Sequence, residues 1–383
     1  MELFNVYSLF NIVPAKAKGC YVWDDKGNKY LDLYGGHAVI SIGHSHPHYV
    51  SKITNQLNKI GFYSNSVINP LQQELALKLG DLSGYPDYQL FLCNSGAEAN
   101  ENAIKLASFI TGRKKIISFT KGFHGRTSGA VALTDNPGIV APFNETENAV
   151  ILPFNDIEAT EKELKTGDVA GIIIEGIQGI GGINIPDNQF LSDLEKLAKK
   201  YGSLFILDEI QSGYGRTGKF FAHQYSDVKP DIITMAKGMG NGFPVGGMII
   251  SPDIKPRTGM LGTTFGGNHL ACAAAIAVLD VMKEENLLLN AQNTGLYLKR
   301  KLEDINPDIT VRGKGLMIGM EFPFEIRLLR NTLLFNYHIF TGVSGKQIVR
   351  LLPPLVIGKS ETDQFLMAYK TLTENFDKFK EQN

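Results

Sequence analysis

Between residue 47 and about residue 250, short apolar runs alternate with segments in which apolar residues recur every three or four positions. The apolar runs are rich in isoleucine, valine and leucine, a pattern that predicts strands buried on both faces. The predicted strands are 88–93, 115–120, 169–175, 203–209, 231–236 and 246–251. The predicted amphipathic helices between them include 100–110, 155–165 and 191–202. This alternation predicts an α/β fold with a mostly parallel sheet that is covered by helices.

The two ends of the chain have a different pattern. Residues 21–34 alternate apolar and polar side chains around a turn, which predicts a β-meander. Beyond the large α/β region, the sequence predicts two helices, a group of short strands and a terminal helix; they span 270–285, 290–305, 309–322, 347–354 and 362–380. We therefore expect a large domain at 47–285 and a small domain formed by both ends, 1–46 and 286–383.

The composition argues against a nucleic-acid-binding, membrane-spanning or disulfide-bonded protein. The chain has 383 residues, and a chain of this size can bury roughly three quarters of its unfolded surface. The 38 Lys and Arg residues and 39 Asp and Glu residues give a net charge of −1, which argues against nucleic acid as a partner. The longest helix-like apolar run, 270–279, is too short for the ~20 residues that span a bilayer. The three cysteines are widely spaced, which fits reduced thiols and a cytoplasmic location.

The first candidate for chemistry is Lys237, which follows the apolar run 231–236 and opens a glycine-rich stretch. A lysine held away from water can lose its proton near neutral pH and act as a nucleophile or base. Asp208, at the end of the preceding predicted strand, could hold a protonated ring nitrogen. Pyridoxal phosphate needs this combination. From these two residues alone, a surface lysine and a turn-capping aspartate are the favoured interpretation.

Two other polar segments follow predicted strands, where ligands sit in open α/β sheets. Residues 94–100 lead small side chains into a helix, which suits either a phosphate site or a serine-capped turn. Residues 121–127 offer Phe123 for stacking on a ring and Arg126 for gripping a carboxylate, although a buried Phe and a solvated Arg are also possible. The glycines of 213–219 lack the βαβ context of a nucleotide site. His44, His46 and His48 lack nearby ligand partners in the sequence, so we expect no metal.

With these segments in place, the chain resembles the class III (ornithine-type) pyridoxal-phosphate aminotransferases over nearly its full length, and is most similar to those acting on acetylornithine or succinylornithine. The stretches that carry the resemblance are GHSHP, NSGAEANENAIKLA, GFHGRTSGA, EGIQGIGGI, LDEIQSGYGRTGKF, MAKGMGNGFPVGG, TTFGGNHLACAAAIAVL, RGKGLMIG and VRLLPPL. The resemblance implies fold type I of the pyridoxal-phosphate enzymes and pyridoxal 5'-phosphate as the cofactor.

The resemblance also implies roles for individual residues around the cofactor. Lys237 corresponds to the Schiff-base lysine and proton shuttle, and Asp208 to the partner of the pyridine nitrogen. The remaining cofactor-binding positions are Gly96 and Ala97 for the phosphate, Phe123 for ring stacking, Gln211 for the phenolic oxygen, and Thr264 for the phosphate of the other subunit. A site shared in this way implies a homodimer.

Substrate residues follow from the same resemblance. Arg126 corresponds to an arginine that binds a substrate carboxylate, Thr263 to a weaker contact, and Arg350 to the arginine for the α-carboxylate of glutamate and 2-oxoglutarate. The implied reaction moves the δ-amino group of an N-acylornithine, acetyl or succinyl, to 2-oxoglutarate in arginine biosynthesis. Ornithine, 4-aminobutyrate and diamines are alternative donors, and a racemase, mutase or decarboxylase on the same fold is the alternative reaction.

The chain departs from the family pattern at four positions. Ile180 stands where a glutamate usually pairs with the C-terminal arginine, and His37 stands where an aliphatic residue is common. Gly176 and His269 replace usual prolines. Because Ile180 and His37 correspond to the substrate side, they leave the amino donor open. Without the glutamate, Arg350 is expected to stay free for a second carboxylate, which a succinyl group has and an acetyl group lacks.

Overall fold

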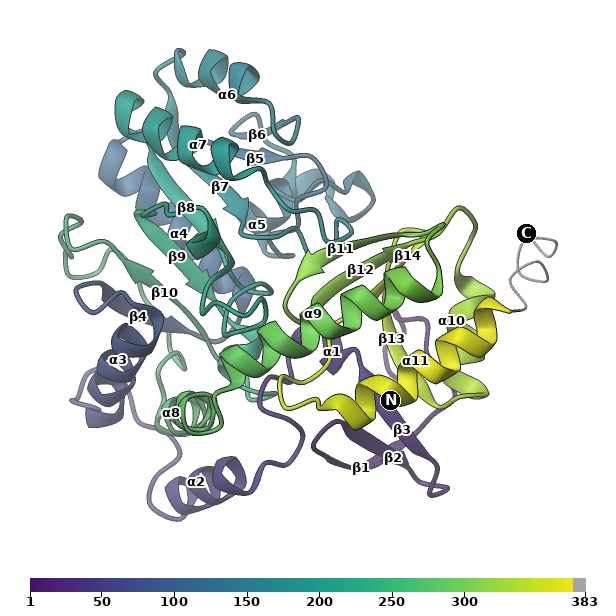
Figure 1. Cartoon of the computed structure of the whole chain (residues 1–383). Helices are drawn as coiled ribbons and strands as arrows, with labels where there is room; N and C mark the ends of the chain where they lie inside the picture. The colour runs from purple at the N-terminus through teal and green to yellow at the C-terminus, as the bar shows by residue number, and fades with distance from the viewer. Residues whose placement is uncertain (375–383) are drawn as a thin grey trace.

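The computed structural model describes residues 1–374 of the chain, and its elements form two seven-stranded sheets (Figure 1). The end of the predicted terminal helix, residues 375–380, lies outside the described residues. The first sheet has the order β4-β10-β9-β8-β7-β5-β6. Its strands are β4 (Gln89–Cys93), β5 (Lys115–Phe119), β6 (Ala149–Leu152), β7 (Val169–Glu175), β8 (Leu204–Asp208), β9 (Ile232–Met235) and β10 (Gly246–Ile250). Only β10 runs antiparallel to its neighbours, so this sheet is mostly parallel, as predicted.

Helices cover both faces of this sheet because successive strand residues point in opposite directions. On β7, Ile172 and Ile174 belong to the same buried cluster as Leu194 of helix α7 (Asn188–Tyr201). The residue between them, Ile173, belongs to the cluster that contains Leu106 of helix α4 (Gly96–Thr111). Strands buried on both sides need apolar residues at nearly every position, which explains the continuous apolar runs of the sequence.

The second sheet joins the two ends of the chain in the order β1-β2-β3-β13-β14-β12-β11. Its strands are β1 (Pro14–Lys18), β2 (Tyr21–Asp24), β3 (Lys29–Leu33), β11 (Thr310–Lys314), β12 (Met317–Glu321), β13 (Ile339–Ser344) and β14 (Ile348–Leu351). The N-terminal meander meets the C-terminal strands at the parallel pair of β3 and β13, where Leu31 is opposite Ile339. The domain limits at 46/47 and 285/286 stay a prediction.

The other helices are α1 (Gly35–Ala38), α2 (Pro47–Leu57), α3 (Pro70–Ser83), α5 (Ser128–Ala132), α6 (Ile157–Leu164), α8 (His269–Glu284), α9 (Leu287–Ile305), α10 (Arg327–Phe335) and α11 (Lys359–Thr373). Several begin at a side-chain cap; in α8, the Asn268 side chain accepts a hydrogen bond from the Ala271 amide at 2.9 Å. Helix α8 is apolar on most of its surface and is buried, as its composition predicts. Within residues 1–374, no helix is both long and apolar enough to cross a membrane.

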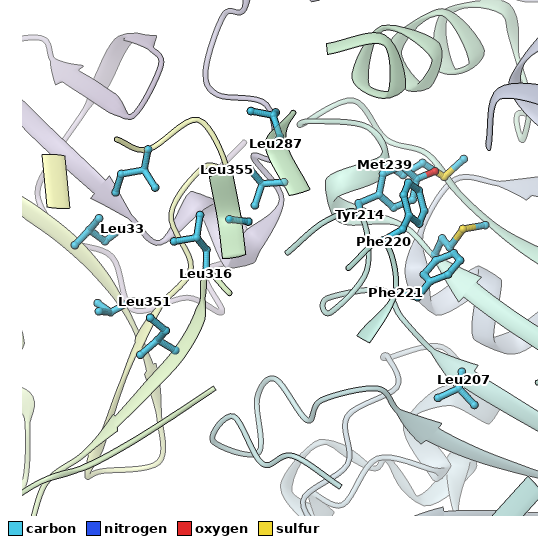
Figure 2. Packing of buried hydrophobic residues seen from close by; sticks show 14 of the residues in the cluster. Leu33, Leu207, Tyr214, Phe220, Phe221, Met239, Leu287, Leu316, Leu351 and Leu355 are labelled. Atoms are coloured by element: carbon cyan, nitrogen blue, oxygen red, sulfur yellow. The ribbon is translucent and has the colours of Figure 1, made fainter. Parts of the chain in front are cut away.

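One hydrophobic cluster extends from the first sheet to the second (Figure 2). It includes Leu207 of β8 in the first sheet and Met239 beside that sheet, and Leu33 and Leu351 within the second. Leu287, at the start of α9, also belongs to it. Because burial of apolar surface is the main favourable term in folding, this shared cluster fixes the two sheets relative to each other. The functional residues below come from both sheets and depend on that fixed arrangement.

Candidate active site

Lys237 lies directly beyond β9, at the carboxyl edge of the first sheet, and begins a short 3₁₀ turn (Lys237–Met239). Its φ of 45° falls in the left-handed region, which is unusual for a residue with a side chain and is found mainly at functional sites. Burial lowers the pKa of the Lys237 amine, and Arg350 adds to this, whereas Asp208 and Glu175 act in the opposite direction. The net lowering favours the neutral amine that a nucleophile requires.

Asp208 ends the neighbouring strand β8 and is almost fully buried. Its Oδ2 accepts hydrogen bonds from Asn100 Nδ2 at 2.7 Å and from His124 Nδ1 at 2.8 Å, while Oδ1 accepts from the Ile210 amide at 3.1 Å. Asn100 is itself held by the Thr234 hydroxyl, which donates to Asn100 Oδ1 at 2.7 Å. These partners fix the position of the carboxylate and keep it hydrogen-bonded in a buried place, where an unpaired charge would be costly.

Glu175, at the end of β7, lies beside this network and positions the next loop. Its Oε1 accepts from the Phe123 amide at 3.0 Å and its Oε2 accepts from the Gly179 amide at 2.9 Å. Burial raises the pKa of Glu175, the charge of Asp208 adds to that rise, and His124 opposes it. Through these two amides, the carboxyl group places the Phe123 ring at the wall of the cavity.

The first turn of α4 forms another side of the site. Ser95 is the N-cap, and its hydroxyl accepts from the Glu98 amide at 3.2 Å. The amides of Gly96 and Ala97 precede that bond and lie at the positive end of the helix dipole, which favours an anion. A Cβ on Gly96 would come within 2.8 Å of Ile210, so glycine is required there for close packing. The serine cap and an anion site are therefore compatible interpretations of the same turn.

These residues surround one cavity of about 420 Å³. It brings together seven of the predicted site residues, which are Gly96, Ala97, Phe123, Arg126, Asp208, Gln211 and Lys237. Arg126 is exposed at its wall. Since this cavity has a buried carboxylate, a lysine with a lowered pKa and a helix N-terminus, it can hold a planar, phosphorylated molecule with a ring nitrogen.

Arg350, on β14, lies just behind the cavity wall and is 2% exposed. Its Nη1 donates to Gln211 Oε1 at 3.2 Å, and Gln211 Nε2 donates to the His37 carbonyl oxygen at 3.3 Å. A chain of hydrogen bonds thus connects the second sheet to the wall of the cavity. Within residues 1–374, no carboxylate lies within 4 Å of the Arg350 guanidinium.

His37 belongs to α1, a single turn whose residues are left-handed. Gly35 and Gly36 both have a φ of 55°, His37 has 68° and Ala38 has 63°. The turn is nevertheless hydrogen-bonded, because the Ala38 amide donates to the Tyr34 carbonyl oxygen at 3.0 Å. Left-handed backbone costs roughly 1–2 kcal/mol for each residue with a Cβ. The strain at His37 and Ala38 indicates a local function, and this turn lies directly beside Gln211.

Ile180 lines the cavity and is 38% exposed. Its carbonyl oxygen accepts a hydrogen bond from the Ser344 hydroxyl at 2.5 Å, which attaches its loop to β13. An apolar side chain cannot form an ion pair with Arg350, whose Nη1 donates to the neutral amide oxygen of Gln211.

Besides Arg350, two predicted site residues lie outside the cavity. Thr264 is exposed and is not part of the cavity wall. Thr263 is half-buried, and its hydroxyl accepts from the Gly266 amide at 3.0 Å. A contact of Thr264 with another subunit's phosphate stays a prediction. Among the described residues, no group of three His, Cys, Asp or Glu side chains could hold a metal ion.

The sequence interpretation missed the roles of Asn100, His124 and Glu175. All three fall inside quoted motifs, and each is a buried polar residue in or beside an apolar element. That pattern was a usable signal, because buried polar groups need partners and are often part of a site. Their partners, in contrast, become visible only when three separate segments meet at Asp208.

Comparisons with known proteins identify the family to which the chain is similar. The family model described as Aminotransferase class-III matches residues 5–372. An acetylornithine aminotransferase of Archaeoglobus fulgidus is 40% identical over 95% of this chain and 96% of its own, and one of Bacillus subtilis is 41% identical over 94% of both chains. Among solved structures, an ornithine aminotransferase of Toxoplasma gondii, described with partial occupancy of pyridoxal phosphate at its active site, superposes with a TM-score of 0.90 at 29% identity, covering 96% of this chain and 91% of that one.

Proposed function

Because this chain belongs to the class III aminotransferases, we propose that it transfers the δ-amino group of an N-acylornithine to 2-oxoglutarate. The products are glutamate and an N-acylglutamate 5-semialdehyde. The observation that carries the choice of donor is the whole-length similarity, at 40–41% identity, to chains named acetylornithine aminotransferase. The ornithine aminotransferase structures from Toxoplasma gondii are less similar, at 28–29% identity.

The enzyme is a transaminase that uses pyridoxal 5'-phosphate. The residues present fit this cofactor: Lys237 is an amine with a lowered pKa, Asp208 is a buried carboxylate with a fixed position, and the α4 amides offer an anion site. When bound, the cofactor supplies an electron sink for the carbon that loses a proton. Phe123 then provides an aromatic wall for its ring.

Each residue contributes a separate task. Lys237 would hold the cofactor covalently, and its neutral amine would move the proton of the substrate carbon. Asp208 keeps a proton on the ring nitrogen, and it performs this task because Asn100 and His124 hold its carboxylate in place. The amides of Gly96 and Ala97 bind phosphate at the helix N-terminus.

The substrate side has two arginines with different surroundings. Arg126 is exposed at the cavity wall and is the partner for the α-carboxylate of the amino donor. Arg350 is buried behind Gln211 and is the partner for the α-carboxylate of 2-oxoglutarate or glutamate. A reaction that alternates between two substrates needs both, and this second clamp disfavours a racemase, mutase or decarboxylase on the same fold.

The acyl group is acetyl or succinyl. Ile180 leaves Arg350 without an acidic partner, which favours a donor with an extra carboxylate and therefore makes N-succinylornithine at least as good a donor as N-acetylornithine. Ornithine and 4-aminobutyrate are the alternative donors within the family. We place the reaction in arginine biosynthesis, in the cytoplasm, and in a homodimer in which Thr264 reaches the partner's phosphate.

A panel of half-reactions tests this function. The holoenzyme is mixed with N-acetylornithine, N-succinylornithine, ornithine or 4-aminobutyrate in turn, and conversion of the cofactor is followed by its absorbance. We expect fast conversion with an acylated donor and slow conversion with the two others. A faster reaction with ornithine or 4-aminobutyrate would overturn the choice of donor, and turnover without 2-oxoglutarate would overturn the transamination itself.

A further inference from the structure

Arg126 lies in the loop between β5 and α5 and is exposed at the wall of the cavity. In the part of the chain that the structure describes, its guanidinium forms no hydrogen bond or ion pair. An arginine without such a partner keeps much of its rotamer freedom. The place from which the Arg126 side chain starts therefore depends on how firmly the backbone is held on either side of it.

Two consecutive residues of α4 hold this loop, one on each side of Arg126. Asn100 Nδ2 donates to the His124 carbonyl oxygen at 2.7 Å, two residues before Arg126. Directly after Arg126, the Thr127 hydroxyl donates to Glu101 Oε2 at 2.7 Å. The loop is thus attached to a single helix turn on both sides of the arginine.

Glu101 also replaces the missing side-chain cap of α5. Its Oε1 accepts from the Gly129 amide at 3.0 Å, and its Oε2 accepts from the Ala130 amide at 3.0 Å. A threonine at an N-cap usually accepts such a bond, but Thr127 makes no cap bond of its own and donates to Glu101 instead. Because three donors converge on one carboxylate, Glu101 fixes both the start of α5 and the residue that follows Arg126.

The same loop lies directly against the first turn of α4. Gly125 has a φ of 137°, and a Cβ there would come within 2.8 Å of the Ala97 Cβ, so only glycine fits. The Thr127 hydroxyl lies 3.5 Å from the Ala97 carbonyl oxygen. Since the Ala97 amide belongs to the anion site for the cofactor, Arg126 keeps a fixed distance from that site as long as the loop stays on α4.

We propose that Glu101 is a positioning residue for substrate recognition, because it holds the loop from which Arg126 meets the α-carboxylate of the amino donor. The inference rests on the proposed function, in which Arg126 is the partner of that carboxylate, and it adds the residue through which Arg126 is held. Glu101 does not line the cavity. It therefore contributes to the discrimination between donors with and without an α-carboxylate, and not to the chemistry at the amino group.

A second use of the Glu101 carboxylate would be to bind a ligand of its own. Glu101 lines a separate cavity of about 300 Å³, together with Lys105 and Lys114. Both lysines are exposed to water, and exposed charges contribute little to binding. Both oxygens of Glu101 already accept hydrogen bonds from the chain. These bonds favour the positioning role.

Two acylated amines that differ only by the α-carboxylate test this role, N-acetylornithine and N-acetylputrescine. Their kcat and KM are measured with the holoenzyme of the wild type and of Glu101→Gln, in which an amide with one acceptor oxygen replaces the carboxylate. We expect the wild type to favour N-acetylornithine by about tenfold or more in kcat/KM. Glu101→Gln should reduce that preference to about twofold through a higher KM for N-acetylornithine. Its kcat and its reaction with N-acetylputrescine should stay within about twofold of the wild type.

A double-mutant cycle shows whether Glu101 acts through Arg126. Arg126→Met should remove the preference, and the addition of Glu101→Gln to Arg126→Met should then change it no further. Calorimetry gives a second measurement: N-acetylnorvaline, which keeps the α-carboxylate and lacks the δ-amino group, should bind Glu101→Gln about fivefold more weakly than the wild type.

The matched control is Asn144→Ala. It removes a hydrogen bond of 3.0 Å between the Asn144 amide and the Ser128 hydroxyl at the exposed start of α5, and it should behave as the wild type. Thr127→Val removes only the hydroxyl that donates to Glu101, and it serves as the test if Glu101→Gln does not fold. We expect from it a smaller loss of the same preference.

An equal loss for both donors in these variants, an unchanged preference, or a further loss of preference in the double variant would overturn the positioning role. A wild type that does not favour N-acetylornithine over N-acetylputrescine would overturn it as well. In each of these cases the proposed function stands if the wild type converts an acylornithine. Failure of the wild type to convert any acylornithine would overturn the function, and the positioning role with it.

Discussion

The cofactor side and the substrate side of the site differ in how their buried charges are compensated. Asp208 has three hydrogen-bond donors within the chain, so its carboxylate is fixed before any ligand arrives. Among residues 1–374, Arg350 and Arg330 bind only carbonyl or amide oxygens, and neither forms an ion pair with a carboxylate. The difference suits a cofactor that stays and substrates that alternate. A permanent group is served by a completed network, whereas an exchanging carboxylate needs a cationic site that stays open.

The largest effect should come from removing the Lys237 amine, which serves both the cofactor side and the substrate side of the site. Lys237→Ala is expected to abolish turnover, because no other described amine lines the cavity to hold the cofactor and move the proton. The measurement is borohydride treatment of the wild-type holoenzyme followed by peptide mapping, which should place the label on the Lys237 peptide. A label on another lysine, or normal turnover of Lys237→Ala, would show that the assignment is wrong.

The second-largest effect should come from removing the negative charge of Asp208 on the cofactor side. Asp208→Asn should still bind the cofactor but lower kcat by about a thousandfold or more, equivalent to ~4 kcal/mol of barrier, because a neutral amide cannot keep a proton on the ring nitrogen. Single-turnover kinetics with either donor would measure this loss. A decrease of less than about tenfold would mean that the charge of Asp208 has no such role.

A smaller effect should follow when the support of Asp208 is removed. Asn100→Ala takes away one donor to Asp208 and leaves the buried Thr234 hydroxyl without its acceptor. We expect a loss of about 1–3 kcal/mol in the free energy of unfolding and a lower kcat with little change in KM. Urea unfolding and steady-state kinetics measure both. Asn102→Ala, on the same helix, is the control and should be close to the wild type, since Asn102 only bonds its own helix.

The smallest effect should come from a change at Ile180 on the substrate side. Ile180→Glu would place a carboxylate within the cavity wall near Arg350 and should shift the kcat/KM ratio by about fivefold from N-succinylornithine towards N-acetylornithine, in line with one partly exposed ion pair. Ile180→Gln, which adds polarity without charge, should leave the ratio unchanged. A wild-type preference for N-acetylornithine that Ile180→Glu does not alter would show that Ile180 has no influence on the donor.

The sequence predicted the first sheet well because its strands are defined locally. The apolar runs at 169–175 and 203–209 correspond to β7 and β8 within one residue at either end. β6, β13 and α10 were missed: β6 is an edge strand of only four residues, and β13 has a weak apolar pattern because glycine and threonine lie within it. The sequence also gave no reason to expect the left-handed turn α1.

The site residues also divide into those that a local sequence pattern predicted and those that it did not. Residues that follow directly after strands, such as Asp208 and Lys237, were placed correctly in the cavity because the carboxyl ends of parallel strands meet at one edge. Tyr34 and Arg330 had no signal of this kind. Tyr34 packs against Gly342 of β13, a contact between segments hundreds of residues apart, and Arg330 of α10 bonds Thr341 of β13, which follows it 11 positions later. Such contacts depend on tertiary structure, and no local pattern encodes them.

The parallel pair of β3 and β13 has a consequence for biosynthesis. Leu31 and Leu33 are buried only when Ile339 and Thr341 pair beside them. At synthesis rates of about 5–20 residues per second, the N-terminal strands wait on the order of tens of seconds for this partner. Until then, β3 is an unpaired apolar edge, which favours aggregation. The first strands of a nascent chain therefore need protection until β13 has been synthesised.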